Sequence, residues 1–288
     1  MTDRRCISRR DFLAAGAATT AAFSLSSSLF AAPKGKDRDD APEKIDWKGF
    51  KMGIQSYSMR GFKLDKAIEE CKKLQLYYWE SFKDHLPVTT VPGEVAKQKE
   101  LLDTNGIKLL AYGVLEFKDD ETKAREYFDY AKAVGIETLS ANPEKNEATF
   151  KLLDKLVEEY QINIAIHNHG PKARYDKIDD VVNAVKDHHP RIGACVDTGH
   201  YLRSSESPVE AIERLKGRVY GCHLKDVKDT KVFKILGEGD LDVLGCLKAL
   251  KAQDYQHVLA LEYEEHPENP VPDLEICLTN LRGALAKL

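Results

Sequence analysis

Short apolar runs alternate with longer amphipathic segments along this chain from residue 51 onward. Eight of the runs have the length and composition of buried strands, at residues 52–57, 77–82, 108–113, 137–141, 163–167, 192–197, 219–224 and 258–263. The segments between and after them have helical patterns, at residues 64–74, 94–104, 121–134, 147–160, 177–187, 208–215, 241–253 and 273–287. Gly106, Gly135 and Pro190 stand where helices are expected to end.

This alternation is typical of strand–helix units that form a parallel sheet covered by helices. Eight units in roughly 240 residues match the size of a (β/α)8 TIM barrel, whereas an open doubly wound sheet usually has fewer strands. No GxGxxG motif follows the first strand, and residues 237–240 are interpreted as a turn or a lid because they lack the rest of a phosphate loop. We therefore predict an α/β protein with one TIM-barrel domain over residues 47–288.

The first residues have the pattern of a targeting segment. Arg9 and Arg10 lie in the sequence Ser-Arg-Arg-Asp-Phe-Leu at 8–13, and a run of small and apolar residues at 14–32 follows them. This pattern matches a twin-arginine signal peptide. The run is too rich in Ala, Ser and Thr, and too short, for the roughly 20 strongly apolar residues of a stable membrane span. We predict a signal over residues 1–32, a charged spacer over 33–46, and export to the periplasm.

Composition narrows the range of partners. The chain is 42% hydrophobic and 31% charged, as in ordinary globular proteins. Its formal net charge of -4 does not provide the basic face that nucleic-acid binding needs, so we expect no nucleic-acid partner. Five cysteines follow the signal, an odd number without a disulfide or CxxC pattern, which predicts buried free thiols. The sequence leaves the oligomeric state open.

Metal-binding residue types gather at the ends of the last four predicted strands. His167, Asp197, His223 and Glu262 each stand at the carboxyl end of a strand, where TIM barrels place their chemistry. A single His or Asp at a strand end is usually structural, but four such residues on consecutive strands indicate that they bind one metal ion together. Two nitrogens and two oxygens suit one divalent ion of Mn, Zn, Co or Fe. Because residues two apart share a face of a strand, His169 is an alternative to His167 as the ligand.

Four sequence runs resemble the xylose isomerase-like TIM barrels described as sugar phosphate isomerases and epimerases. They are Ala-Ile-His-Asn-His-Gly at 165–170, Val-Asp-Thr-Gly-His at 196–200, His-Leu-Lys-Asp at 223–226 and Leu-Glu-Tyr-Glu at 261–264. The resemblance covers essentially the whole chain after the spacer, and it is specific to the superfamily but not to one substrate. It implies that Asp197, His223 and Glu262 are metal ligands, and that a fourth ligand, usually Glu, ends strand five.

His167 stands where that family has its usual Glu. In epimerases of the family, the two Glu residues exchange a proton with carbon from opposite faces of the sugar. Here only Glu262 can do so as a carboxylate, because a metal-bound His167 has no free lone pair for a proton. The substitution argues against a symmetric epimerase and leaves open an isomerase with one base, a dehydratase or another β-eliminating lyase.

Further residues are expected around the metal. We predict catalytic roles for Glu262 as base, for His200, which resembles the family's substrate-binding His, and for Lys225, a fixed cation beside an enolate oxygen. Substrate binding is predicted for His169, Gln55, Trp79 and Glu80, with Tyr57 as a further lining residue. For Glu80, contact with a ligand His and a surface position are both open. Glu264 and Glu265 are expected to face solvent.

The leading hypothesis is a metal-dependent isomerase, epimerase or lyase that removes a proton next to a carbonyl of a small carbohydrate or polyol. We expect an unphosphorylated substrate, such as a keto-sugar or glycoside, because the protein is predicted to be exported and shows no clustered Arg or phosphate loop. Two other classes remain. One is a sugar-binding barrel without turnover, and the other is a phosphodiesterase like the related apurinic endonucleases, which the acidic balance and the few ligands disfavour.

Overall fold

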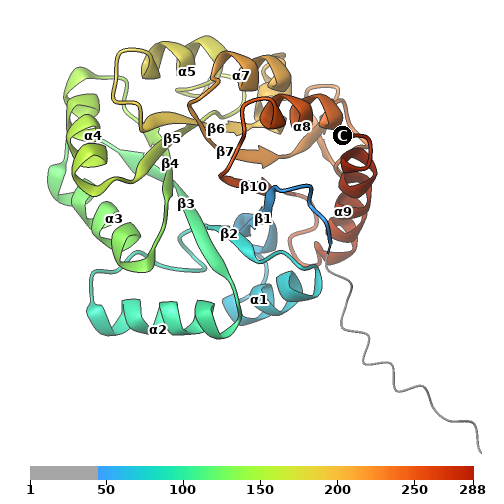
Figure 1. Ribbon diagram of the computed structural model, residues 1–288, viewed down its shortest axis with the longest axis horizontal. Coiled ribbons are helices and arrows are strands. Elements are labelled where there is room, and N and C mark those ends of the chain that lie inside the picture. The colour runs from blue at the N-terminus through green and yellow to red at the C-terminus, as the bar shows by residue number, and fades with distance from the viewer. Residues whose placement is uncertain (1–44) are drawn as a thin grey trace, which may run out of the picture. The chain divides into compact units, whose positions relative to one another are not determined.

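The computed structural model of the protein describes residues 45–288. Eight parallel strands close into a barrel in the order β1-β10-β7-β6-β5-β4-β3-β2, and the helices surround it (Figure 1). The barrel strands are β1 (Lys51–Gln55), β2 (Tyr78–Ser81), β3 (Lys108–Phe117), β4 (Thr138–Pro143), β5 (Asn163–His167), β6 (Ile192–Asp197), β7 (Val219–Leu224) and β10 (Val258–Leu261). The predicted TIM-barrel fold is confirmed.

The helices follow the strands in the expected alternation. They are α1 (Leu64–Lys73), α2 (Pro92–Thr104), α3 (Glu121–Val134), α4 (Glu147–Tyr160), α5 (Ile178–Val185), α6 (Thr198–Arg203), α7 (Pro208–Arg214), α8 (Val243–Lys251) and α9 (Val271–Leu285). Four short elements were not predicted: α6, the 3-10 helix η1 (Ser56–Met59), and an antiparallel hairpin of β8 (Asp226–Lys228) and β9 (Val232–Lys234). They are too short to produce a periodic signal in the sequence.

The strands appear in the sequence as continuous apolar runs because both of their faces are buried. Every residue of β5 and of β6 is buried, with helices outside and other strand side chains inside. On α4, Leu152, Leu153 and Leu156 are buried in the core, as the helical spacing predicted. Burial of each such Leu contributes roughly 1.5–3 kcal/mol. A polar residue at the end of a strand therefore stands out against a hydrophobic background.

Strand β3 is longer than predicted. The sequence suggested an end at Gly113, but β3 runs to Phe117. Its pairing with β4 is irregular between Tyr112 and Leu115 and then resumes, with Leu115 opposite Ala141. A bulge of this kind re-aims the strand without ending it, and it brings Gly113 and Val114 to the rim of the barrel mouth.

Two predictions on the N-terminal part lie outside the described residues: the twin-arginine signal and all but the last two residues of the spacer. Within the described part of the chain, none of the helices has the length and apolar character needed to cross a bilayer. The five described cysteines are all free and buried, as expected.

Candidate active site

A cavity of about 330 Å³ opens at the carboxyl ends of the barrel strands. It is lined by Gln55, Tyr57, Phe82, Gly113, Val114, His167, His169, His200, His223, Lys225, Glu262 and Glu264. A second cavity, of about 400 Å³, lies between α4 and α5 on the outside of the barrel, and Phe150 and His188 are among its lining residues. Most of the predicted site residues line the first cavity, so we place the candidate active site there.

Four ligand-type side chains converge at the base of this cavity. One donor atom from each of His167, Asp197, His223 and Glu262 lies within 4.8 Å of the other three. His167 Nε2 is 3.1 Å from His223 Nδ1 and 3.4 Å from Asp197 Oδ2, and His223 Nδ1 is 3.0 Å from Glu262 Oε2. The strand register explains the convergence, because Asp197 stands directly opposite His223 on neighbouring strands.

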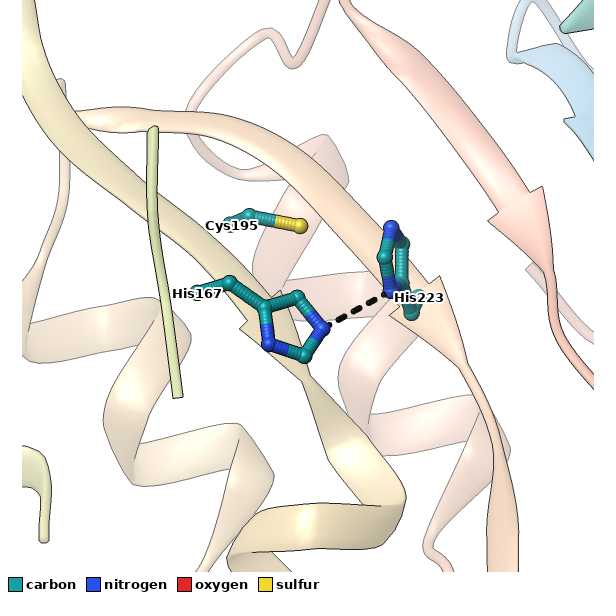
Figure 2. Close-up of side chains that lie close together, drawn as sticks. All are labelled: His167, Cys195 and His223. Carbon is teal, nitrogen blue, oxygen red and sulfur yellow. Dashed lines mark hydrogen bonds between the residues drawn. The ribbon is translucent and has the colours of Figure 1, made fainter. Parts of the chain in front are cut away.

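Cys195 offers a competing donor beside the two imidazoles. Figure 2 shows its side chain beside His167 and His223, and the three form a second group of donor atoms within 4.8 Å of one another. Burial raises the pKa of the Cys195 thiol to about 11, which opposes formation of the thiolate that metal binding requires. The group with two carboxylates is the better ligand set.

A buried carboxylate orients His223. Its Nε2 lies 2.8 Å from Glu80 Oε2, and both side chains are almost completely buried. Burial opposes ionisation of Glu80, but the neighbouring His223 outweighs it, so the pKa of Glu80 is lowered. The Glu80 carboxylate accepts a hydrogen bond from His223 Nε2–H. This leaves the lone pair of Nδ1 facing the other candidate ligands, as in carboxylate–histidine–metal arrangements. Glu80 therefore contacts His223, a candidate ligand, and is not at the surface.

The charges of the four-residue group and its carboxylate oxygens without hydrogen bonds fit a divalent cation. Asp197 Oδ2 and Glu262 Oε2 are buried and accept no well-directed hydrogen bond, which is costly without a further partner. Burial opposes their ionisation, but nearby positive groups, foremost Lys225, lower the pKa of Glu262 to about 2 and that of Asp197 well below its ordinary value. Burial likewise opposes protonation of His223, yet the acidic groups around it raise its pKa. The two carboxylate oxygens are negatively charged, and the surroundings of His223 favour a positive charge on its ring. A metal ion would suit this group and would replace the proton on the His223 ring.

Asn168 and Thr198 hold these strand ends together, and sequence reasoning had given neither a role. The Asn168 amide pairs with the backbone of Asp197, accepting from its N at 2.8 Å and donating to its O at 3.0 Å. The Thr198 hydroxyl lies between the backbone of His223 and that of Lys225, where it accepts from Lys225 N at 2.9 Å. Asn168 directly follows His167, and Thr198 directly follows Asp197. A polar residue next to a predicted ligand is the sequence signal that could have indicated their structural role.

Lys225 is a buried cation beside the ligand group. Its Nζ lies 2.9 Å from Asp197 Oδ2, 3.0 Å from Glu262 Oε2 and 2.6 Å from Glu264 Oε1. Space for its stem requires glycine at position 199, where a Cβ would lie 2.7 Å from Lys225 Cγ. The expectation that Glu264 faces solvent is wrong, because it lines the cavity and pairs with Lys225, whereas Glu265 is exposed. Glu262 and Glu264 both follow β10, and both line the cavity.

Two more histidines line the cavity on the side of β5 and α6. His169 Nδ1 lies 3.4 Å from His167 Nδ1, and burial lowers the pKa of His169 to about 3. Burial also lowers the pKa of His200 to about 3. Both rings are therefore neutral near pH 7. His200 is placed by Asp197, whose Oδ1 accepts from His200 N at 2.7 Å and so caps α6.

Trp79 does not line the cavity, contrary to the prediction. It is fully buried in the hydrophobic core, and its indole Nε1 donates to Leu76 O at 3.2 Å. Successive side chains of a strand point to opposite faces, so the inward position of Glu80 turns Trp79 outward to the helices. Gln55 does line the cavity, and its Oε1 accepts from Tyr57 N. Phe82, which follows β2, lines the cavity and was missed.

The fold and this site define a (β/α)8 barrel with a candidate metal centre at the carboxyl ends of its strands. The chain belongs to the xylose isomerase-like TIM barrel family, whose model matches residues 68–280.

Relatives extend over most of the chain. The inosose dehydratase of Clostridium botulinum (strain Alaska E43 / Type E3) is 24% identical over 278 residues, covering 83% of this chain and 91% of the relative. Among solved structures, a protein from Parabacteroides distasonis ATCC 8503 is 25% identical with a TM-score of 0.65, covering 82% of this chain and 99% of that one. The IOLI protein, crystallised with a bound zinc atom, is 19% identical with a TM-score of 0.66, covering 82% and 98%.

Proposed function

We propose that this protein is a metal-dependent lyase of the dehydratase type. Its substrate would be a small, unphosphorylated keto-sugar or keto-polyol, from which it removes a proton next to the carbonyl and expels an oxygen substituent from the following carbon. The family membership and the dehydratase among its relatives support the reaction class. The zinc in a similar barrel supports a metal at the four-ligand group.

One observation carries the choice of a lyase over an epimerase: the carboxylates that line the cavity stand on one side. Glu262 and Glu264 both follow β10, whereas the side of β5 presents His167 and His169. Epimerisation by proton exchange needs a base on each face of the carbon, whereas elimination needs one base and a group that assists the departing oxygen. The site has this asymmetry.

The residues divide the work by their chemistry. His167, Asp197, His223 and Glu262 would hold the metal, which when bound polarises the substrate carbonyl. Glu262 takes the proton from carbon, because the other carboxylate at the cavity, Glu264, is held in a hydrogen bond by Lys225. Lys225, a buried cation at the cavity wall, stabilises negative charge on a substrate oxygen.

A panel of keto-sugars and keto-polyols in D2O, followed by NMR with the metal-loaded protein, tests this function. We expect an unsaturated product and loss of the β-oxygen. A deuterated epimer without elimination would show an epimerase instead, and binding without exchange would show a sugar-binding barrel. The variant His167→Glu restores the second carboxylate, so it should retain metal and shift the products toward epimerisation. If its product ratio equals that of the natural protein, the asymmetry does not determine the reaction.

We also propose that the protein is exported through the twin-arginine pathway. The support is the sequence around Arg9 and Arg10 and the apolar run behind it. Export favours an unphosphorylated substrate, because phosphorylated sugars belong mainly to the cytoplasm.

A further inference from the structure

Arg203, at the end of α6, contacts the side of His200 that faces away from Lys225. Its Nη1 lies 3.2 Å from His200 Nδ1. A guanidinium has N–H donors and no acceptor, so this contact is a hydrogen bond only if Nδ1 has a lone pair. A neutral imidazole has one lone pair and one N–H, which puts the proton of His200 on Nε2. An imidazolium at this position would direct an N–H against the guanidinium.

Lys225 presents the competing possibility, a hydrogen bond to His200 Nε2, which lies 3.4 Å from its Nζ. An ammonium has three N–H groups, and three carboxylate oxygens lie 2.6 to 3.0 Å from this one, from Asp197, Glu262 and Glu264. A neutral imidazole accepts only one hydrogen bond, so His200 cannot accept from both Arg203 and Lys225, and the Arg203 contact is the shorter of the two, at 3.2 Å against 3.4 Å. The ammonium of Lys225 has the carboxylates as its partners, foremost Glu264 Oε1, to which it donates. His200 and Lys225 therefore stand side by side at the cavity as two donors, with Nε2 and Nζ 3.4 Å apart.

The structure makes room for Arg203 at this position. A Cβ on residue 170 would lie 2.9 Å from Arg203 Nη1 and 3.0 Å from its Cζ, so Gly170 admits the guanidinium. On another side, Arg203 Cζ lies 5.4 Å from the ring centre of Phe233 on β9, within the range of a cation–π contact. The ring of Phe233 also stands edge-on to His200, with centres 6.2 Å apart. Among residues 45–288, no carboxylate forms an ion pair with Arg203, so its polar partner there is the ring of His200.

We propose that Arg203 is a positioning residue that fixes His200 as an Nε2–H donor, so that His200 and Lys225 together hold one oxygen of the substrate. The oxygen is one that accepts two hydrogen bonds and gains negative charge, such as a carbonyl oxygen or a departing hydroxyl. In this tautomer His200 has no lone pair toward the cavity, so it acts as a donor and not as a base. The role of His200 and Lys225 in turnover rests on the proposed function, whereas the tautomer of His200 does not depend on it.

Long-range 1H–15N NMR of the purified protein labelled with 15N-histidine reads the tautomer directly, and His200→Gln assigns the signals. We expect a protonated Nε2 and an unprotonated Nδ1 in the natural protein. Arg203→Met removes the donor at similar length and should shift the proton toward Nδ1, because Nε2 can then accept from Lys225. Arg203→Lys should restore part of the original pattern. A protonated Nδ1 in the natural protein, or an unchanged pattern in Arg203→Met, overturns the proposal.

Two further variants separate this effect from damage to the fold. Gly170→Ala keeps the arginine but displaces it, so it should reproduce part of the Arg203→Met pattern; an unchanged pattern would contradict the contact. Arg214→Met removes an exposed arginine of α7 that pairs with Asp179 and Glu210, so the His200 signals should stay as they are. A change in Arg214→Met as large as in Arg203→Met would show that the signals report general disturbance.

Turnover distinguishes the two proposals. Where a substrate is found, Arg203→Met should lower kcat by about 10²-fold, the lower range for a positioned proton donor, and Arg203→Lys should recover part of the loss. The expected NMR patterns without turnover of any keto-substrate would refute the lyase and support the role of Arg203. Elimination with an NMR pattern independent of Arg203 would refute that role and support the lyase.

Discussion

Replacing Glu80 with Gln tests whether the buried carboxylate orients a metal ligand. In the structure, Glu80 Oε2 accepts from His223 Nε2 at 2.8 Å, and neither side chain has appreciable access to solvent. Gln has the same shape and keeps one acceptor oxygen, but it removes the negative charge next to the imidazole. The ring then donates to a neutral amide and is a weaker ligand.

The expected loss is 10- to 100-fold in metal affinity, the range for such partners of a metal-bound His, or about 1.4–2.7 kcal/mol. It is smaller than the effect of removing a ligand, because the four donor atoms remain. Competition titration with a chromophoric chelator measures the affinity for Zn²⁺ and Mn²⁺ in the natural protein and in Glu80→Gln, and circular dichroism checks the fold.

Glu70→Gln is the matched control. Glu70 is also a nearly buried glutamate, but it lies on α1 and pairs with Lys66 and Lys73, outside the site. Its replacement should leave metal affinity unchanged. Equal affinities of Glu80→Gln and the natural protein would refute the reasoning, and so would an equal loss in both variants.

Four other changes probe the site, the hairpin and the export signal. Asp197→Ala should lose most of the expected content of about one divalent ion per chain while the fold persists; elemental analysis with unchanged metal would exclude Asp197 as a ligand. Glu262→Gln keeps a coordinating oxygen but should slow proton exchange at carbon by about 10²- to 10⁴-fold in D2O, the range for a general base, and near-normal exchange would place the base elsewhere. Asp226 is buried and accepts from the backbone N of Gly237, Gly239 and Leu241 at 2.8 to 3.0 Å, so Asp226→Asn should lower the free energy of unfolding by roughly 1–3 kcal/mol, with denaturant titration as the measurement. Lysine at both Arg9 and Arg10 should leave unprocessed protein in the cytoplasm; normal processing in a fractionation assay would rule out the twin-arginine route.

The fold was predictable because a TIM barrel repeats one local pattern. The barrel strands are largely buried on both faces, and the helices are buried on one face. Along the chain, continuous apolar runs therefore alternate with segments in which apolar residues recur at helical spacing. The same physics made the candidate ligands visible in the sequence. His167, Asp197, His223 and Glu262 are polar residues at the ends of apolar strands, and parallel strands bring those ends to the same rim.

Within the strands, the alternation of faces held more information than the prediction used. On β2 it is consistent with Glu80 facing inward and Trp79 facing the helices.

Only the tertiary structure decided which side chains pair with one another. Glu80 and His223 are 143 residues apart, and their contact depends on closure of the barrel, which brings β2 and β7 across one interior. The position of Arg203 depends on a short helix, on the space at Gly170 and on a hairpin too short for a periodic pattern. Local periodicity follows from the burial of each segment in turn, whereas a hydrogen bond between distant side chains depends on the packing of all the segments at once.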